Sequence, residues 1–240
     1  MAAGKGTRMK NPDKSKVMFE LKGKPMIEYV VERALEIDSD RIILIVGHQK
    51  QSVIDFIKDR FANDMHRISF AHQDEQLGTG HAVMQTKELL NDFDGDVLIL
   101  SGDVPLLTND TLEDFISFHE GNNFTGSLIS AIFEDPHGYG RIIRDVNEKF
   151  TDIVEEKDAN EMQKQIKEIN SGIYLVNNAL LFEALDNIST DNAQGEYYLT
   201  DIFRYFIGKE LPIGATPVEN NLEITGVNTI EQLTELEQYV

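Results

Sequence analysis

In the first half of this 240-residue chain, short apolar runs alternate with amphipathic segments whose apolar residues recur at helical spacing. The apolar runs predict strands at 41–46, 68–71 and 97–100, and the amphipathic segments predict helices at 27–37, 53–61, 82–90 and 111–119. A continuous apolar run such as 41–46 is typical of a strand buried on both faces. This order predicts a parallel sheet covered by helices, in which ligands bind beyond the carboxyl ends of the strands.

The second half is richer in strands. Apolar segments predict strands at 128–133, 140–146, 150–156 and 169–176, with a turn at Asn147–Glu148, and helices at 179–185, 199–207 and 230–239. We therefore predict one α/β domain over residues 1–240. Its core would be a Rossmann-like doubly wound mixed sheet, and a strand-rich insertion would hold a second substrate.

The charge and composition of the chain limit the classes of partner that it can bind. The formal net charge of −20 argues against nucleic acid, because phosphate backbones require a basic surface. No apolar run approaches the roughly 20 residues that span a membrane. The chain contains no cysteine, which excludes disulfides and cysteine-ligated metals and favours a reducing, cytoplasmic location.

A glycine-rich stretch at residues 2–9 (AAGKGTRM) carries the strongest local signal. Its small residues allow backbone amides to approach phosphate oxygens, and cations are concentrated around it, at Lys5, Arg8, Lys10, Lys14 and Lys16. Met9 stands where a dinucleotide-binding fingerprint needs a third small residue, and no P-loop spacing is present. The stretch is a phosphate-binding loop or, alternatively, a surface turn with basic residues.

A phosphate loop in a doubly wound sheet follows the first strand, which takes a central position. Only Met1, Ala2 and Ala3 precede Gly4, so at most the tip of that strand is expected. We expect the start as given to lie downstream of the natural one or to have been trimmed.

The loop is followed by motifs that extend over nearly the whole chain. In order these are KV at 16–17, GKPM at 23–26, QDEQLGTGHA at 73–82, SGDVPL at 101–106, GYGRI at 138–142, INSG at 169–172, NAQGEYYLTD at 192–201 and GVN at 226–228. The set resembles the nucleotide-diphospho-sugar pyrophosphorylases, and within them the bacterial uridyltransferases that act on N-acetylglucosamine 1-phosphate. Ser15, Asp74 and Ser101 depart from the pattern without removing a functional group.

The resemblance divides the chain into a nucleotide-binding half, roughly 1–120, and a sugar-binding half, roughly 121–228. It implies a nucleotide site made of Ala2, Ala3, Gly4, Lys5, Gly6, Lys16, Gln73, Gly78, Thr79, Ser101, Gly102 and Asp103. Gln73 would read uracil, since a carboxamide offers both a donor and an acceptor. Alternatively, Gln73 is an exposed loop residue. Gly78 and Gly80 suggest backbone approach to a ligand, or simple turns.

The resemblance also implies that Asp103 and Asn228 bind Mg²⁺, an ion that prefers oxygen ligands. Alternatively, Asp103 caps a turn and Asn228 caps the helix that follows it. Gly140, Glu155, Asn170 and Asn228 would bind the sugar, although a one-residue shift of the strand would exchange Glu155 for Glu156. Residues 192–201 are expected to be structural, with Tyr197 and Tyr198 packed and Thr200 starting a helix. His81 is assigned no chemistry.

The implied reaction is Mg²⁺-dependent transfer of a uridylyl group from UTP to N-acetylglucosamine 1-phosphate. It gives UDP-N-acetylglucosamine, a cell-wall peptidoglycan precursor, and pyrophosphate, with Arg8, Lys16 and Asp103 as the catalytic residues. Bifunctional family members continue into an acetyltransferase domain, so a chain that ends at Val240 is not expected to acetylate. Two alternatives stay open: a sibling enzyme with another base or sugar, and a non-catalytic nucleotide-sugar sensor. The sequence leaves the oligomeric state open.

Overall fold

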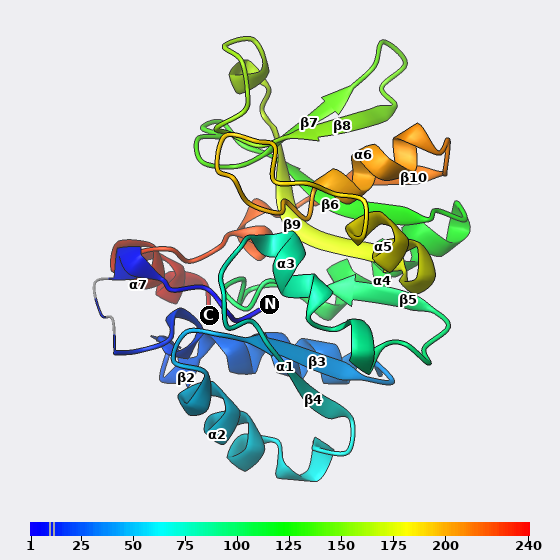
Figure 1. Cartoon of the computed structure of the whole chain (residues 1–240). Coiled ribbons are helices and arrows are strands. Elements are labelled where there is room, and N and C mark those ends of the chain that lie inside the picture. Colours follow the sequence, from blue (N-terminus) through cyan, green and yellow to red (C-terminus); the bar gives the residue numbers. More distant parts are fainter. Residues whose placement is uncertain (10, 12) are drawn as a thin grey trace.

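The computed structural model describes residues 1–9, 11 and 13–240, so Lys10 of the predicted basic cluster lies outside the described residues. Helices and strands mix along the chain, as expected for an α/β fold (Figure 1). The helices are α1 (Met26–Glu36), α2 (Lys50–Arg60), α3 (Thr79–Met84), α4 (Asn109–Gly121), α5 (Asn178–Leu185), α6 (Asp201–Gly208) and α7 (Ile230–Leu236). The strands are β1 (Glu20–Leu21), β2 (Lys24–Pro25), β3 (Ile42–Val46), β4 (Ile68–His72), β5 (Asp96–Ile99), β6 (Gly126–Ile132), β7 (Arg141–Arg144), β8 (Phe150–Val154), β9 (Glu168–Asn177) and β10 (Ile213–Pro217).

The predicted strands are all present, but the helices differ in their bounds; the helix predicted at 53–61, for example, runs from Lys50 to Arg60. The helix predicted at 82–90 begins three residues earlier, at Thr79, and ends at Met84, followed by a separate 3-10 turn at Lys87–Leu89. Thr86 ends it, because both its amide and its hydroxyl bond to the carbonyl of Val83, at 2.9 and 2.7 Å. The helix predicted from 199 begins at Asp201, and the helix predicted to run to 239 ends at Leu236 with a 3-10 turn after it.

Strand β10 was not predicted. It contains Gly214 and ends at Pro217, and both residue types are rare in strands. It forms nonetheless, because it pairs in parallel with β6 from Ile213 to Pro217. The ring of Phe124 lies where a Cβ at Gly214 would be, only 2.4 Å away, so the absent side chain makes room for this packing.

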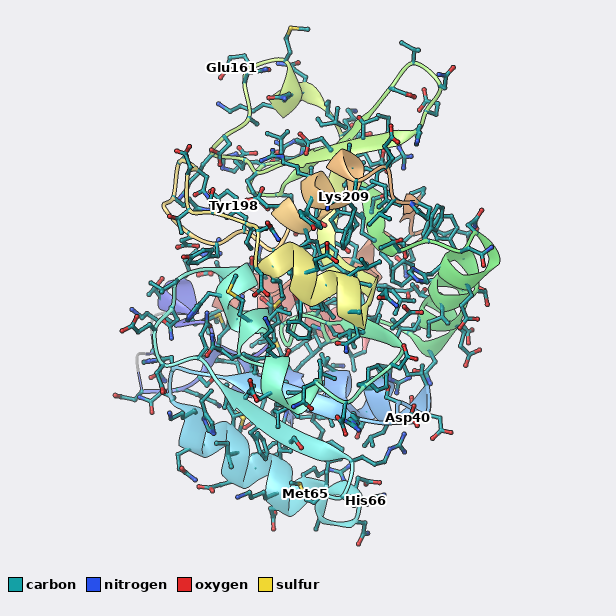
Figure 2. All side chains as sticks on the ribbon, turned by 45° about the vertical axis from the view of Figure 1, so that its right-hand side comes forward. Asp40, Met65, His66, Glu161, Tyr198 and Lys209 are labelled. Carbon is teal, nitrogen blue, oxygen red and sulfur yellow. The ribbon has the colours of Figure 1, made fainter. Side chains whose placement is uncertain are left out.

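The main sheet is mixed, with the strand order β10-β6-β9-β7-β8 and β5 paired with β9, while β3 with β4 and β1 with β2 form two-stranded sheets. Strands β3 and β4 pair in parallel, as do β6 and β10, whereas β9 pairs antiparallel with β5, β6 and β7. The β5–β9 pair joins the first half of the chain to the second. In Figure 2, Glu161 and His66 mark opposite ends of the molecule, and Tyr198 lies between them.

Helices cover both faces of the strands. Alternate residues of β3 divide between two clusters, because successive side chains in a strand point to opposite faces. Ile45 packs in the cluster that contains α3, α5 and α6, while Leu44 packs with α1 and α2. In β9, Val176 joins the first of these clusters and Leu175 packs with α4. No helix in the described part of the chain is long and apolar enough to cross a membrane.

Residues Met1 to Ala3 take the central position between β3 and β5. The amide of Ala2 donates to Ile45 at 2.8 Å, and the amino group of Met1 donates to Leu100 at 2.6 Å. The bridge between Ala2 and Val46 is parallel, as expected for the tip of a strand. Behind Met1, a cavity of about 540 Å³ separates β3 from β5. The predicted strand tip is therefore confirmed, and it delivers the glycine-rich loop to the carboxyl end of β3.

Candidate functional site

The glycine-rich loop leaves the sheet at Ala3 and turns back over Lys16. Gly6 has a φ of +58°, and a Cβ there would lie 2.6 Å from the Cβ of Lys16. Glycine is therefore required at position 6 both by backbone conformation and by contact. Gly4 faces open space, with no atom within 4 Å of its Cβ position. The fold of the loop thus brings Lys16 beneath it and leaves room above Gly4.

Four side chains from distant parts of the chain meet beside this loop. The ammonium of Lys16 contacts Asp103 Oδ2 and donates to Asn228 Oδ1 at 2.7 Å. Arg8 donates to the same Asn228 oxygen at 2.8 Å. The predicted basic cluster is only partly assembled, because Lys14 lies over the ring of Phe19, 5.1 Å from its centroid. Lys5 is exposed on the loop.

The alternative role for Asn228, a helix cap, is wrong. Helix α7 is capped by Thr229, whose side chain accepts from Gln232, and the Gln232 side chain completes a capping box. This frees the Asn228 carboxamide to face Lys16 and Arg8. The backbone of Asp103 holds the two segments together, since its carbonyl accepts from the amide of Val227 at 2.9 Å.

The donor atoms of Asp103 and Asn228 suit a hard cation. A carboxylate and an amide oxygen converge on one ammonium group, so they are close enough to share a positive ion. Among the described residues, no group of three or more His, Cys, Asp or Glu could hold a metal. A magnesium ion could take these two oxygens and complete its shell with substrate oxygens and water, as it commonly does.

A cavity of about 290 Å³ extends from this cluster. It is lined by Met1, Ala2, Ala3, Gly4, Lys16, Val17, Gln73, Gln76, Gly78, Thr79, Ala82, Ser101, Asp103 and Glu196. Most of the predicted nucleotide residues are therefore brought together, with Lys5 and Gly6 outside the lining. Gly102 also lies outside it, and packs against the Met1 carbonyl, 2.8 Å from its Cβ position. Gln73 is buried rather than exposed, which removes the alternative of a free loop residue.

The glycines around Thr79 are both required by packing, a reason that the sequence did not suggest. A Cβ at Gly78 would lie 2.5 Å from the carbonyl oxygen of Tyr197, and one at Gly80 would lie 3.0 Å from it. The Thr79 hydroxyl accepts from the amide of Leu199 at 3.0 Å. Close approach here is thus to the 197–199 segment, although Gly78 and Thr79 still line the cavity.

A second cavity, of about 210 Å³, adjoins the first and shares Met1, Thr79 and Ser101 with it. Its other walls are Gly138, Tyr139, Gly140, Glu155, Asn170, Ser171, Gly172, Tyr174, Leu199 and Thr200. The predicted residues Gly140, Glu155 and Asn170 all line it. Asn228 does not, and belongs to the cation cluster instead.

The strand register selects Glu155 rather than Glu156. Glu155 faces the second cavity, where its Oε1 accepts from the Thr200 hydroxyl at 3.1 Å. Glu156 turns away and pairs with the guanidinium of buried Arg141 at 2.7 Å. Burial raises the pKa of Glu155 above its ordinary value, and the hydrogen bond from Thr200 only partly opposes this.

A β-bulge in β9 aims the remaining polar groups. The register between β6 and β9 shifts near Ile129, where Gly172 has a φ of +81°. The shift places Tyr174 opposite Leu128 and Asn170 opposite Ser130, so these two residues of β9 lie closer together than in a regular strand, and the Asn170 carboxamide donates to the tyrosine hydroxyl at 2.7 Å. Burial raises the pKa of Tyr174, so it is neutral at ordinary pH.

Sequence reasoning missed several lining residues. Thr200 with Asp201 was expected to start a helix, and Thr200 does stand at the N-cap of α6; its side chain makes no capping bond, however, and contacts Glu155 instead. Tyr139 and Tyr174 were not selected, although each lies beside or within a recognised motif. Their pattern in the sequence is that of ordinary core aromatics, so only the fold separates them from the core.

Comparison with known proteins establishes the family. The nucleotidyl transferase family matches residues 1–220. The bifunctional protein GlmU of Thermoanaerobacter pseudethanolicus is 48% identical over 240 residues, covering 99% of this chain and 50% of that protein. The GlmU protein of Acholeplasma laidlawii is 42% identical over 240 residues, covering 100% of this chain and 50% of that protein. The chain therefore belongs to the nucleotidyl transferase family, which confirms the resemblance seen in its motifs, and it spans about half the length of these curated relatives.

The fold agrees with solved structures. The crystal structure of UDP-glucose pyrophosphorylase complexed with UDP-glucose matches with a TM-score of 0.80 at 20% identity, covering 99% of this chain and 95% of that chain. The apo form of UDP-glucose pyrophosphorylase matches with a TM-score of 0.76, also at 20% identity, covering 99% of this chain and 95% of that chain. The predicted α/β fold with a mixed sheet is thus confirmed.

Proposed function

We propose that this chain transfers a uridylyl group from UTP to N-acetylglucosamine 1-phosphate, giving UDP-N-acetylglucosamine and pyrophosphate. One observation carries the proposal: two adjoining cavities share Thr79 and Ser101, and the cation cluster lies at the edge of one of them. A bisubstrate reaction between two phosphorylated molecules needs this arrangement, because both substrates must meet beside positive charge.

In the proposed reaction, a phosphate oxygen of the sugar 1-phosphate attacks the α-phosphorus of UTP. A new oxygen–phosphorus bond forms, the bond from the α-phosphorus to the bridging oxygen breaks, and pyrophosphate leaves with that electron pair. The attacking oxygen is already an anion, so no general base is needed. Catalysis then rests on positioning and on neutralising charge, as in phosphoryl transfer generally.

Lys16 and Arg8 are the residues proposed to meet the phosphates. Both lie against Asn228 Oδ1, and Lys16 also contacts Asp103. Local cations matter more in this chain than in a neutral one, because its net charge of −20 repels a triphosphate. Lys5, exposed on the loop, is proposed to assist as the triphosphate enters.

Asp103 and Asn228 are proposed to hold Mg²⁺, which when bound neutralises charge on the phosphate oxygens. An ion held by these two oxygens would compete with the ammonium of Lys16, which would then be available to a phosphate. In this proposal Lys16 would keep the two ligands together before substrates arrive and would bind substrate afterwards.

Recognition of the base and the sugar is assigned to buried polar groups. Gln73 is proposed to read uracil from the first cavity. In the second cavity, Glu155 and Asn170 offer a carboxylate and a carboxamide to the hydroxyl and N-acetyl groups of the sugar. Gly140 supports this use, because its missing side chain leaves space 3.4 Å from Glu155 Oε2.

The proposal is tested by measuring pyrophosphate release with UTP and N-acetylglucosamine 1-phosphate, with and without a chelator of Mg²⁺. Parallel reactions with CTP, dTTP and glucose 1-phosphate distinguish a sibling enzyme, which would prefer one of these substrates. If no pair releases pyrophosphate while UTP or the nucleotide sugar still binds, the chain is a sensor rather than an enzyme. Retention of Lys16, Asp103 and Asn228 in contact favours the enzyme.

A further inference from the structure

His81 lies between two glutamine side chains, next to the nucleotide cavity. Its Nδ1 is 3.3 Å from Gln73 Nε2, and its Nε2 is 3.2 Å from Gln85 Nε2. The ring stacks on Tyr197 with centroids 6.4 Å apart. A neutral imidazole has one donor and one acceptor nitrogen, so it can accept from only one of these two amides.

Two neighbours, the Gly78 carbonyl and His81, favour one orientation of the Gln73 amide, and the carbonyl can only accept. Gln73 Nε2 lies 3.0 Å from the carbonyl oxygen of Gly78, which requires a donor, so the nitrogen of the amide must face it. The second hydrogen of the same nitrogen is directed at His81 Nδ1. With both hydrogens engaged, the carbonyl oxygen Oε1 is the group that Gln73 has left for a ligand.

Competition between the two glutamines decides which nitrogen of His81 accepts. Gln73 is 4% exposed, so a lost partner would leave a buried donor unsatisfied. Gln85 is more exposed and already donates to the His81 carbonyl at 2.9 Å, so water can satisfy its remaining groups. The tautomer with hydrogen on Nε2 and an accepting Nδ1 is therefore favoured.

We infer that His81 is a positioning residue which holds the Gln73 amide with its oxygen toward the base, and so selects bases that carry a hydrogen on N3. This inference rests on the proposed function. Uracil donates from N3, whereas cytosine accepts there. A Gln73 amide free to rotate could present its nitrogen to cytosine. The acceptor on His81 prevents that rotation, because the turned amide would place its oxygen Oε1 against two other acceptors, Nδ1 and the Gly78 carbonyl.

Two variants of nearly equal shape test this role. His81→Asn places an oxygen acceptor at the position of Nδ1, and His81→Leu places a methyl group there; both remove the ring from Tyr197. The readout is the ratio of kcat/KM for UTP to that for CTP. We expect the ratio to fall about 10-fold or more in the leucine variant, as expected when a buried polar partner is lost, and to stay within about threefold of the parent in the asparagine variant. Gln85→Leu serves as a control and should keep the parent ratio.

If the ratio falls equally in both His81 variants, the effect comes from the ring and the inference is overturned. An unchanged ratio in the leucine variant would also overturn it. Thermal midpoints of all variants establish that they are folded. Equilibrium binding of UMP and CMP to the same proteins gives a readout without turnover. If the parent binds UMP selectively but releases no pyrophosphate, the proposed function fails while the role of His81 is still decided by the binding ratios.

Discussion

The two halves of the site hold their polar groups by different means. On the nucleotide side, the working groups are cations on a loop and a 3-10 turn, and Arg8 and Lys5 are exposed. On the sugar side, Asn170 and Tyr174 lie on β9, and both are buried. Under the proposed function, binding on the nucleotide side would depend on summed positive charge near the triphosphate, whereas binding on the sugar side would depend on fixed hydrogen-bond geometry in a low-dielectric environment.

This difference predicts that substitution of Asp103 has the largest effect on activity, because Asp103 contributes both a charge and a fixed contact. Asp103→Asn should lower kcat about 10²–10³-fold, as loss of one preorganised electrostatic group does. The fold should persist, because the backbone carbonyl of Asp103 still accepts from Val227. Steady-state pyrophosphate release measures the change, with exposed Asp114→Asn as the matched control. Turnover near the parent value at saturating Mg²⁺ would remove Asp103 from the metal site.

On the nucleotide side, charge removal should act through the triphosphate. Lys16→Ala and Arg8→Ala should each lower kcat/KM for UTP about 10-fold or more, since each would lose a charge-assisted contact of about 1.5–3 kcal/mol. The apparent constant for the sugar phosphate should change less. Lys58→Ala on the exposed surface of α2 removes the same charge elsewhere. An equal effect at all three positions would indicate only a general response to net charge.

On the sugar side, one substitution should weaken binding of the sugar phosphate and at the same time stabilise the fold. Glu155→Gln keeps an oxygen acceptor for Thr200 but removes a charge whose burial is unfavourable. We expect a rise of several-fold in KM for the sugar phosphate, together with a rise of about 2–4 °C in the thermal midpoint at neutral pH, equivalent to about 1 kcal/mol.

The pH dependence gives a second test of Glu155. Its folded-state pKa is raised, so the folded state binds the proton more tightly than the unfolded state. The favourable contribution of the protonated group is complete below the ordinary glutamate pKa and is lost as pH rises through the raised value. The stability gain of the glutamine variant should therefore vanish at low pH. A gain of the same size at every pH would have another cause.

The smallest effect should come from Ser15, next to the cation cluster. Its hydroxyl is fully buried and has no hydrogen-bond partner among the described residues. Ser15→Ala should raise the free energy of unfolding by about 1 kcal/mol, because it removes an unsatisfied polar group, and activity should not fall. Urea denaturation measures the change, with Ser52→Ala as a control whose hydroxyl is exposed and bonded to Gln49. Destabilisation by Ser15→Ala would mean that the hydroxyl has a partner, such as water.

Much of the site could be predicted because its residues lie in contiguous motifs. Gln73, Asp103, Glu155 and Asn170, each predicted to bind a substrate or metal, all line one of the two cavities, and their binding roles stay predictions. Asn228, predicted for both the sugar and the metal, does not line the second cavity, because capping by Thr229 leaves the Asn228 side chain facing Lys16. Strand β10 was missed because its stability comes from pairing with β6 and not from its own composition.

The sequence by itself determined the order of most helices and strands, the glycine-rich loop and the family, since these depend on local periodicity and on residues adjacent in the chain. Only the tertiary structure decided between Glu155 and Glu156, gave Gly78 and Gly80 their packing role against Tyr197, and set His81 between two glutamines. Each of these depends on side chains that approach from distant segments. Local sequence carries no information on such contacts, because hydrogen bonding and steric exclusion act through space.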